Sequence, residues 1–252
     1  MAKDSGWFYS AEMSHRQREI VRGPKPSSLR MVLNSIITIL FFPGIVLLLS
    51  GDWRWLEGWI FGLWFAAMVL ATTVYLSIYD PALLAERSRI RFDENQKTWD
   101  RYVMISIYLL AFAWFVVMPL DARRFGWSPP FPAWLKLFGW VMLIASLYLI
   151  FLSTTENTFA STMVRIQTER QQRVITTGVY GFVRHPMYLG AVLMMFGAPF
   201  LLGSIWSLPI AIIAVMVLVG RIIGEEKMLV NELNGYVDYT KRVRYRLIPF
   251  VW

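Results

Sequence analysis

Apolar residues occur along this chain in stretches of about twenty, and polar segments separate the stretches. A helix needs about 20 apolar residues to cross the roughly 30 Å hydrocarbon core of a bilayer. The pattern predicts an all-α fold, a compact polytopic transmembrane helix bundle. Its spans are expected at residues 31–49, 57–79, 103–120, 134–153, 186–203 and 205–223.

The polar segments differ in their content of basic residues. Of the 25 Lys and Arg residues, only Arg54, Arg123, Arg124 and Lys136 lie in or beside the short joins. The other 21 lie in the longer segments, at residues 1–30, 80–102, 154–185 and 221–252. Because cytoplasmic loops carry an excess of Lys and Arg, we expect both termini to be cytoplasmic. The last segment is then a C-terminal cytosolic helical segment.

Composition supports a membrane protein. Charged residues make up 17% of the chain, whereas soluble domains carry about a quarter. The net charge of +8 would suggest nucleic acid as a partner of a soluble protein. Here the basic residues flank apolar spans, so membrane lipid is the expected partner and nucleic acid is not. The first 30 residues are polar, unlike a cleavable signal peptide. We expect a multi-pass protein of a bacterial or archaeal inner membrane, or of the endoplasmic reticulum, with its site facing the cytoplasm.

The last two spans are joined by only a few residues, so they must run antiparallel as a hairpin. His185 opens the first span and Glu225 follows the second, 40 residues later. Each arm of about 19 residues rises about 28 Å, so the chain returns to the same face of the membrane. The segments "RHPMY" and "GEEK" should therefore be neighbours in space.

These two segments carry complementary chemistry. Pro186 suits the first turn of a helix, and Arg184 and His185 then lie where free backbone N–H groups attract an anion. Glu225 and Glu226 lie opposite, followed by the aromatic and basic tail "YVDYTKRVRYRLIPF". A zwitterion with a carboxylate, an ammonium group and an aromatic ring would use all of these groups. S-adenosylmethionine is one such ligand and adds a sulfonium cation; phospholipid headgroups share some of its groups.

Each feature also has a structural explanation. Arg184 could be a positively charged membrane anchor. His185 could be a histidine at the membrane interface whose hydrogen bonds are made within the protein. The glutamate pair could be partners of Arg221. His15 lies in the polar N-terminal segment without a partner pattern and is left out of the site. The conjunction of both segments at the ends of one hairpin favours a functional site.

At these residues the chain resembles the isoprenylcysteine carboxyl methyltransferase family and the related phospholipid methyltransferases. The motif Gly-x-Tyr-x-x-x-Arg-His-Pro-x-Tyr-x-Gly is present as "GVYGFVRHPMYLG". After the hairpin come the Glu-Glu pair in "GEEKML" and a tail near "RLIPF". The resemblance covers residues 154–252, which it implies are a catalytic region; residues 1–153, with four spans, match only as generic membrane helices within one compact domain.

The resemblance implies a membrane-embedded methyltransferase that uses S-adenosylmethionine. It implies Glu225, Glu226, Arg184 and Arg246 as catalytic residues, the glutamates for the amino group and acceptor and the arginines as anion contacts. The cofactor-binding residues that we expect are Tyr180, His185, Pro186, Tyr188, Leu189, Gly190, Glu225, Gln167 and Tyr239. In the segment before the motif, Asn157 and Arg165 are further candidates. No metal site is expected, and the chain has no cysteine.

Methyl transfer to a carboxylate or thiolate needs alignment rather than a strong base, because two opposite charges are neutralised as the bond forms. We expect a lipophilic small-molecule or lipidated acceptor, of the isoprenylcysteine α-carboxylate type. Alternatives are methylation of a phospholipid amine or a small thiol. A related NADPH-dependent sterol or enone reductase, and a non-catalytic transporter or lipid-binding scaffold, are further alternatives. The sequence does not indicate an oligomeric state.

Overall fold

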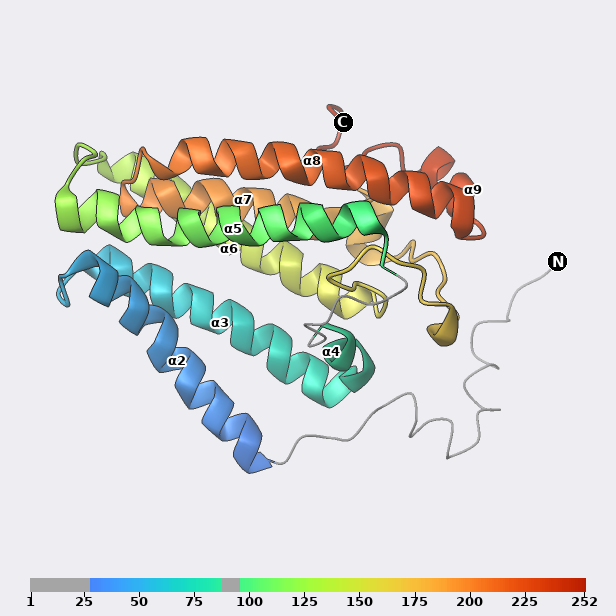
Figure 1. Cartoon of the computed structure of the whole chain (residues 1–252), viewed down its shortest axis with the longest axis horizontal. Helices are drawn as coiled ribbons and strands as arrows, with labels where there is room; N and C mark the ends of the chain where they lie inside the picture. The colour runs from blue at the N-terminus through green and yellow to red at the C-terminus, as the bar shows by residue number, and fades with distance from the viewer. Residues whose placement is uncertain (1–27, 88–95) are drawn as a thin grey trace.

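A computed structural model describes residues 28–87 and 96–252, with side chains from residue 32 onward (Figure 1). Every regular element in these ranges is helical, so the predicted all-α class is confirmed. The elements are α2 (Ser28–Ser50), α3 (Leu56–Tyr79), α4 (Pro81–Arg87), α5 (Thr98–Pro119), the π-helix η1 (Leu120–Phe125), α6 (Ala133–Glu156), the short 3₁₀ helices η2 (Thr168–Arg170) and η3 (Gly178–Gly181), α7 (Pro186–Leu202), α8 (Ser207–Glu232) and α9 (Tyr236–Arg242). His15 lies outside the described residues.

Six of these helices correspond to the six predicted spans. Five of them, α2, α3, α5, α6 and α8, are long and apolar enough to cross a membrane, whereas α7 is apolar but has only 17 residues. So many long apolar helices indicate an integral membrane protein. Which side of the membrane the termini occupy stays a prediction.

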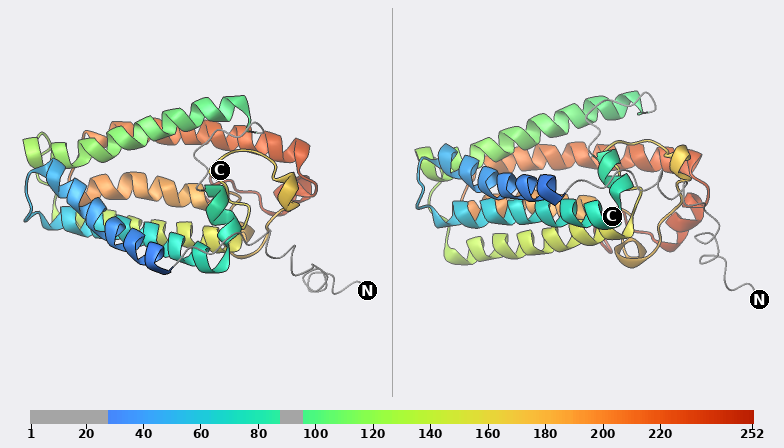
Figure 2. Two further views of the ribbon diagram at one scale, coloured as in Figure 1. Left: turned by 60° about the horizontal axis from the view of Figure 1, so that its bottom comes forward. Right: turned by 90° about the horizontal axis from the view of Figure 1, so that it is seen from below.

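The six apolar helices pack mainly as three pairs. Helix α6 packs extensively on α7, and α5 packs on α8. Figure 1 shows α5, α7 and α8 all running along the long axis, and the two views in Figure 2 show α6 beside α7. Helix α2 packs mainly on α3 and diverges from the rest of the bundle toward its N-terminal end.

Small residues bring α6 and α7 close together. A Cβ atom at Gly139 would lie 2.5 Å from the backbone nitrogen of Leu201, and one at Gly197 would lie 2.9 Å from the carbonyl oxygen of Gly139. Near the other end of the pair, the Ser146 hydroxyl donates a 2.7 Å hydrogen bond to the carbonyl of Gly190. Small residues and interhelical hydrogen bonds are the usual means of helix association in membranes. They hold the first turns of α7 firmly against α6.

Two buried tryptophans connect the other helices to this pair. The indole N–H of Trp64 in α3 donates to the carbonyl of Leu143 in α6, at 3.1 Å. The indole of Trp114 in α5 donates to the carbonyl of Met195 in α7, also at 3.1 Å. Both rings lie in the main apolar core. Each indole therefore satisfies its one polar group while filling the core.

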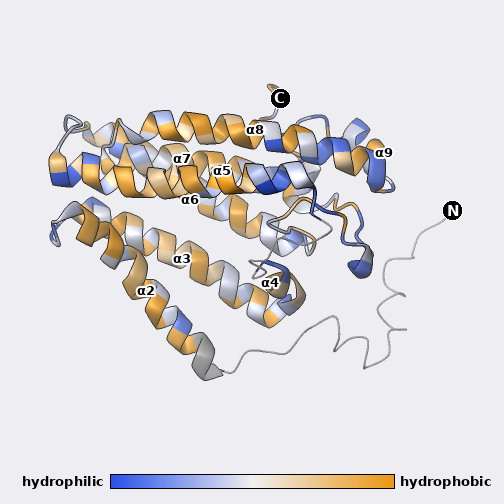
Figure 3. Ribbon diagram, in the orientation of Figure 1, coloured by the Kyte–Doolittle hydropathy of each residue, from blue (hydrophilic) through white to orange (hydrophobic). Residues whose placement is uncertain are grey.

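The two ends of the bundle differ. At one end, the fully buried carboxylate of Asp121 accepts hydrogen bonds from the hydroxyls of Ser128 and Ser204 and from the backbone of Trp206. These bonds fasten the short α7–α8 turn to the end of α5. Figure 3 shows polar residues gathering at the opposite end, over the end of α8, helix α9 and the loops beside them. The candidate site lies at this polar end.

Candidate functional site

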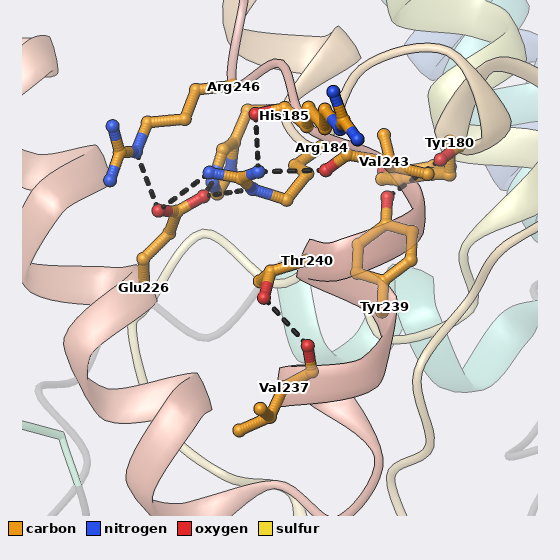
Figure 4. Close-up of polar contacts among 10 residues, drawn as sticks. Tyr180, Arg184, His185, Glu226, Val237, Tyr239, Thr240, Val243 and Arg246 are labelled. Carbon is orange, nitrogen blue, oxygen red and sulfur yellow. Dashed lines mark hydrogen bonds and ion pairs between the residues drawn. The ribbon is translucent and has the colours of Figure 1, made fainter.

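The hairpin of α7 and α8 brings "RHPMY" and "GEEK" together, as the helix geometry predicted. His185 immediately precedes α7, and its Nε2 lies 3.2 Å from Oε1 of Glu226 in the last third of α8 (Figure 4). Pro186 occupies the first turn of α7, as predicted. The turn that reverses the chain begins at Gly203, whose φ of 81° is favourable for glycine and strained for other residues.

Glu226 lies at the centre of a buried ion cluster. Arg184 donates to both of its oxygens, at 2.5 and 3.1 Å, and Arg246 donates at 2.7 Å. Arg184 also donates to the carbonyls of Val243 and Arg244, at 2.8 Å each. Arg184 precedes α7, Arg246 lies in the tail and Glu226 lies in α8. Glu226 therefore links three separate parts of the chain.

Glu225 has a different environment. Its Oε2 accepts a 2.6 Å hydrogen bond from the hydroxyl of Tyr188, one turn into α7. The same hydroxyl accepts a 3.0 Å hydrogen bond from Arg221, whose Nε donates to the fully buried Asp100 at 2.9 Å. A chain of polar contacts therefore runs from α5 through Arg221 and Tyr188 to the carboxylate of Glu225.

These groups border a cavity at the polar end of the bundle. Glu225 lines it and Glu226 does not. The other lining residues are Asn157, Phe159, Ala160, Ser161, Met163, Val164, Arg165, Gln172, Arg173, Val174, Ile175, Tyr180, Arg184, His185, Met187, Tyr188, Met228, Leu229, Leu233, Tyr236 and Tyr239. All of them come from the region that follows α6, within residues 154–252, to which the sequence resemblance extends. The wall is mostly apolar and aromatic, with a few charged groups, as is typical of small-molecule sites.

The predicted site residues fall into two groups. Those that line the cavity are Tyr180, Arg184, His185, Tyr188, Glu225 and Tyr239, together with the further candidates Asn157 and Arg165. Those that do not line it are Pro186, Leu189, Gly190, Glu226, Arg246 and Gln167. The second group supports the wall from behind.

The supporting residues act through specific contacts. Gly190 lies against α6, where an added Cβ would be 2.7 Å from Ile150. Leu189 packs in a cluster with Leu218 and Ile222 of α8. Gln167 is buried, and its side chain donates to the carbonyl of Phe159, a lining residue. Arg246 contacts Glu226 and stacks over the ring of Trp252, 5.0 Å from its centroid.

Aromatic rings form a large part of the wall. The rings of His185 and Tyr188 stack with centroids 5.5 Å apart. Burial raises the pKa of Tyr180 to about 12 and raises the pKa of Tyr236 and Tyr239 as well. The three phenols are therefore neutral at physiological pH. The Tyr239 hydroxyl donates to the carbonyl of Tyr180 at 2.7 Å and closes this side of the wall (Figure 4).

Sequence reasoning missed several contributors. Phe159, Arg173 and Met187 line the cavity, and Asp100 holds Arg221 from α5. Asp100 could have been identified from the sequence, because a carboxylate in the first turn of an apolar helix needs a partner when it is buried. The others lie in loops or on apolar helix turns, where no periodic pattern marks them.

Known proteins resemble this chain in sequence and in fold. The family model "Phospholipid methyltransferase" matches residues 134–234, from α6 to the end of α8. Protein-S-isoprenylcysteine O-methyltransferase B of Arabidopsis thaliana is 31% identical over 126 residues, which are 47% of this chain and 61% of that protein.

A solved structure of the eukaryotic intramembrane Ras methyltransferase ICMT has the same fold. The similarity covers 97% of this chain and 89% of that one, with a TM-score of 0.53 and 20% sequence identity. The residues that the family model matches include the motifs "GVYGFVRHPMYLG" and "GEEKML". The resemblance predicted from the sequence is confirmed: the chain is similar in sequence to phospholipid and isoprenylcysteine carboxyl methyltransferases, and it spans 61% of the length of the Arabidopsis relative.

Proposed function

We propose that this protein is an S-adenosylmethionine-dependent methyltransferase of the membrane that methylates the carboxylate of a lipophilic acceptor, of the isoprenylcysteine type. The observation that carries the proposal is the cavity at the end of the α7–α8 hairpin, where the Glu225 carboxylate faces a wall of aromatic rings. The Arabidopsis relative is named for the same reaction. Residues 154–252 form the catalytic region in this proposal, and the preceding helices form its membrane scaffold.

The residues of the cavity fit the donor. Glu225 would bind the ammonium group, because it lines the cavity and, within residues 28–87 and 96–252, no arginine forms an ion pair with it. The exposed guanidinium of Arg173 lines the same cavity and would bind the donor carboxylate. The ring face of Tyr236, which also lines the cavity, would attract the sulfonium. Met163 and Leu229 offer apolar surface to the adenosyl group.

When bound, the donor supplies an electrophilic methyl group: its carbon–sulfur bond breaks with the electron pair passing to sulfur, and a new bond forms from the acceptor oxygen to the methyl carbon. No proton is transferred, so this chain's residues need only orient the two substrates and exclude water. Opposite charges disappear in the reaction, which a partly dry cavity favours. The neutral phenols of Tyr180 and Tyr239 suit such a wall.

The two substrates have different routes in this proposal. The cavity lies at the polar end of the bundle, which we propose faces the cytoplasm, where the donor is dissolved. The acceptor's apolar tail would remain among the membrane helices. The polar tripeptide Arg184-His185-Pro186 at the start of an apolar helix then marks the boundary between the two routes.

A second candidate is methylation of a phospholipid amine, because the matching family model is named for phospholipid methyltransferases. An amine acceptor is protonated at neutral pH and must lose a proton before it attacks. A carboxylate is already the reactive form. The two candidates therefore differ in the charge of the acceptor that the site must accommodate.

The test is methyl transfer by the purified protein reconstituted in liposomes. Tritiated S-adenosylmethionine would be supplied with N-acetyl-S-farnesyl-cysteine, with phosphatidylethanolamine or with a small thiol, in separate reactions. We expect label in the farnesyl-cysteine methyl ester, and loss of that label in Glu225→Gln. Label in the phospholipid would select the second candidate. Binding of NADPH without binding of S-adenosylhomocysteine would refute both and favour a reductase.

A further inference from the structure

Arg87, the last residue of α4, reaches the wall of the cavity from the N-terminal half of the chain. Its Nε donates to the carbonyl of Ala160 at 2.9 Å, and its Nη2 contacts the sulfur of Met187 at 3.4 Å. Both Ala160 and Met187 line the cavity. Among the described residues, the Nη1 group of Arg87 has no hydrogen-bond acceptor. The guanidinium therefore retains donor capacity beside the cavity.

Five other non-exposed arginines of this region each have a carboxylate partner. Arg165 pairs with Glu86 and Glu169, and Arg184 and Arg246 with Glu226. Arg221 pairs with Asp100, and Arg170 lies 3.8 Å from Asp80. Within the described residues, no carboxylate lies within ion-pair distance of Arg87. Arg87 differs from these five arginines, because it has no carboxylate partner among the residues that the structure describes.

The carboxylate of Asp80 is occupied elsewhere. It accepts hydrogen bonds from the backbone of Leu83 and the hydroxyl of Thr158, and it faces Arg170. Burial lowers the pKa of Arg87, and electrostatic interactions with Tyr180 and Asp80 only partly offset the loss of solvent. A guanidinium nevertheless stays protonated in proteins. A partly buried cation without a counter-ion is costly, so an anionic ligand group at this position would recover that cost.

We propose that Arg87 binds the carboxylate of the methyl acceptor. This inference rests on the proposed function and assigns to α4 a direct role in selecting the substrate. Arg87 lies on the side of the first turn of α7, next to the membrane helices, whereas the exposed Arg173 lines the cavity from the loop that follows α6. The partly buried cation is thus placed for the lipophilic substrate and the exposed one for the water-soluble donor.

The chemistry of the guanidinium suits this role. Its planar N–H groups bind a carboxylate oxygen directionally and leave the second oxygen available to attack the methyl carbon. The same positive charge repels a protonated amine. Arg87 would therefore favour carboxylate acceptors over the headgroup of phosphatidylethanolamine, and this preference follows from charge rather than from the shape of the lipid tail.

The test compares two acceptor probes that differ in one group: N-acetyl-S-farnesyl-cysteine and its carboxamide. The carboxamide keeps the farnesyl chain but has no negative charge. For the wild-type protein loaded with S-adenosylhomocysteine, we expect the carboxylate probe to bind about tenfold or more tightly than the carboxamide. In Arg87→Gln this preference should fall to near unity, with unchanged affinity for the carboxamide. Arg87→Lys keeps the charge without the planar fork, and we expect an intermediate preference.

A matched control removes a distant guanidinium. Arg54 is exposed in the turn between α2 and α3, at the opposite end of the bundle, and Arg54→Gln has the same change in net charge. This variant should keep the wild-type preference. If Arg87 only fastened the loop at Ala160 to α7, Arg87→Gln would weaken both probes equally, and that result would overturn the proposal.

Binding of S-adenosylhomocysteine shows whether Arg87 contacts the acceptor or the donor. We expect wild type and Arg87→Gln to bind S-adenosylhomocysteine with equal affinity. If Arg87→Gln instead lost affinity for S-adenosylhomocysteine but not for 5′-methylthioadenosine, which has no carboxylate, Arg87 would bind the donor carboxylate. That result would refute the inference. Should wild type bind no S-adenosylhomocysteine at all, the proposed function itself fails. Should Arg87→Gln not fold, the comparison of the two probes on wild type and on Arg87→Lys still decides the question.

Discussion

The hydroxyl of Tyr188 donates a 2.6 Å hydrogen bond to Oε2 of Glu225, across the two arms of the α7–α8 hairpin. Arg221 donates to the same hydroxyl at 3.0 Å and is itself held by Asp100 of α5. The contact therefore fixes the orientation of a carboxylate that lines the cavity without neutralising its charge. An uncompensated carboxylate in this position is what recognition of an ammonium group requires.

Tyr188→Phe tests this positioning role. The substitution removes the hydroxyl, so Glu225 loses a donor and Arg221 loses an acceptor. We expect affinity for S-adenosylhomocysteine to fall about tenfold, since a hydrogen bond to a charged group contributes roughly 1.5–3 kcal/mol. Isothermal titration in detergent measures the change. Tyr148→Phe, at an exposed position of α6, is the control and should bind as wild type does.

The adjacent glutamates should have separable roles. Glu226→Gln leaves the guanidinium groups of Arg184 and Arg246 without their carboxylate, so we expect a loss of roughly 3–5 kcal/mol in stability. Thermal unfolding in detergent measures it. Glu225→Gln should unfold near the wild-type temperature while donor affinity falls. Equal loss of stability in both variants would contradict this division.

The contact between α6 and α7 depends on the absence of a side chain at Gly139. A Cβ there would lie 2.5 Å from the backbone nitrogen of Leu201, which cannot move without shifting α7. We expect Gly139→Ala to lower the unfolding temperature. Gly220, within α8, has no atom within 4 Å of an added Cβ. Gly220→Ala is the control and should be neutral or stabilising by about 0.5–1 kcal/mol.

Alkaline pH should destabilise the protein through Tyr180. Burial raises its pKa to about 12 in the folded protein, whereas an unfolded tyrosine ionises near pH 10. Below pH 10 both states hold the proton and stability is unaffected. Between about pH 10 and 12 the unfolded state loses the proton first, so the free energy of unfolding falls, by up to roughly 2–3 kcal/mol.

The measurement is the free energy of unfolding against pH for wild type and Tyr180→Phe. The variant has no phenol at this position, so its decrease above pH 10 should be smaller by the amount assigned to Tyr180. Identical curves for both proteins would show that Tyr180 ionises at an ordinary pKa.

Much of the fold could be predicted from the sequence, for a simple physical reason. Backbone groups cannot remain unpaired in hydrocarbon, so a long apolar stretch must be helical, and the six predicted stretches correspond to six helices. The short turn at Gly203 and the rise per residue of a helix then bring His185 and Glu226 to the same end. Local rules of length and geometry decide these features.

Tertiary structure alone decided how the neighbouring glutamates differ. Successive residues point about 100° apart around a helix, but the sequence does not show which direction faces the cavity. That depends on where the tail residue Arg246 and the Arg184 side chain lie, and both contact Glu226. The proximity of Arg87 to Met187, 100 residues apart, also follows from packing. Contacts between distant segments leave no periodic pattern in the chain, because they depend on how complete helices pack together.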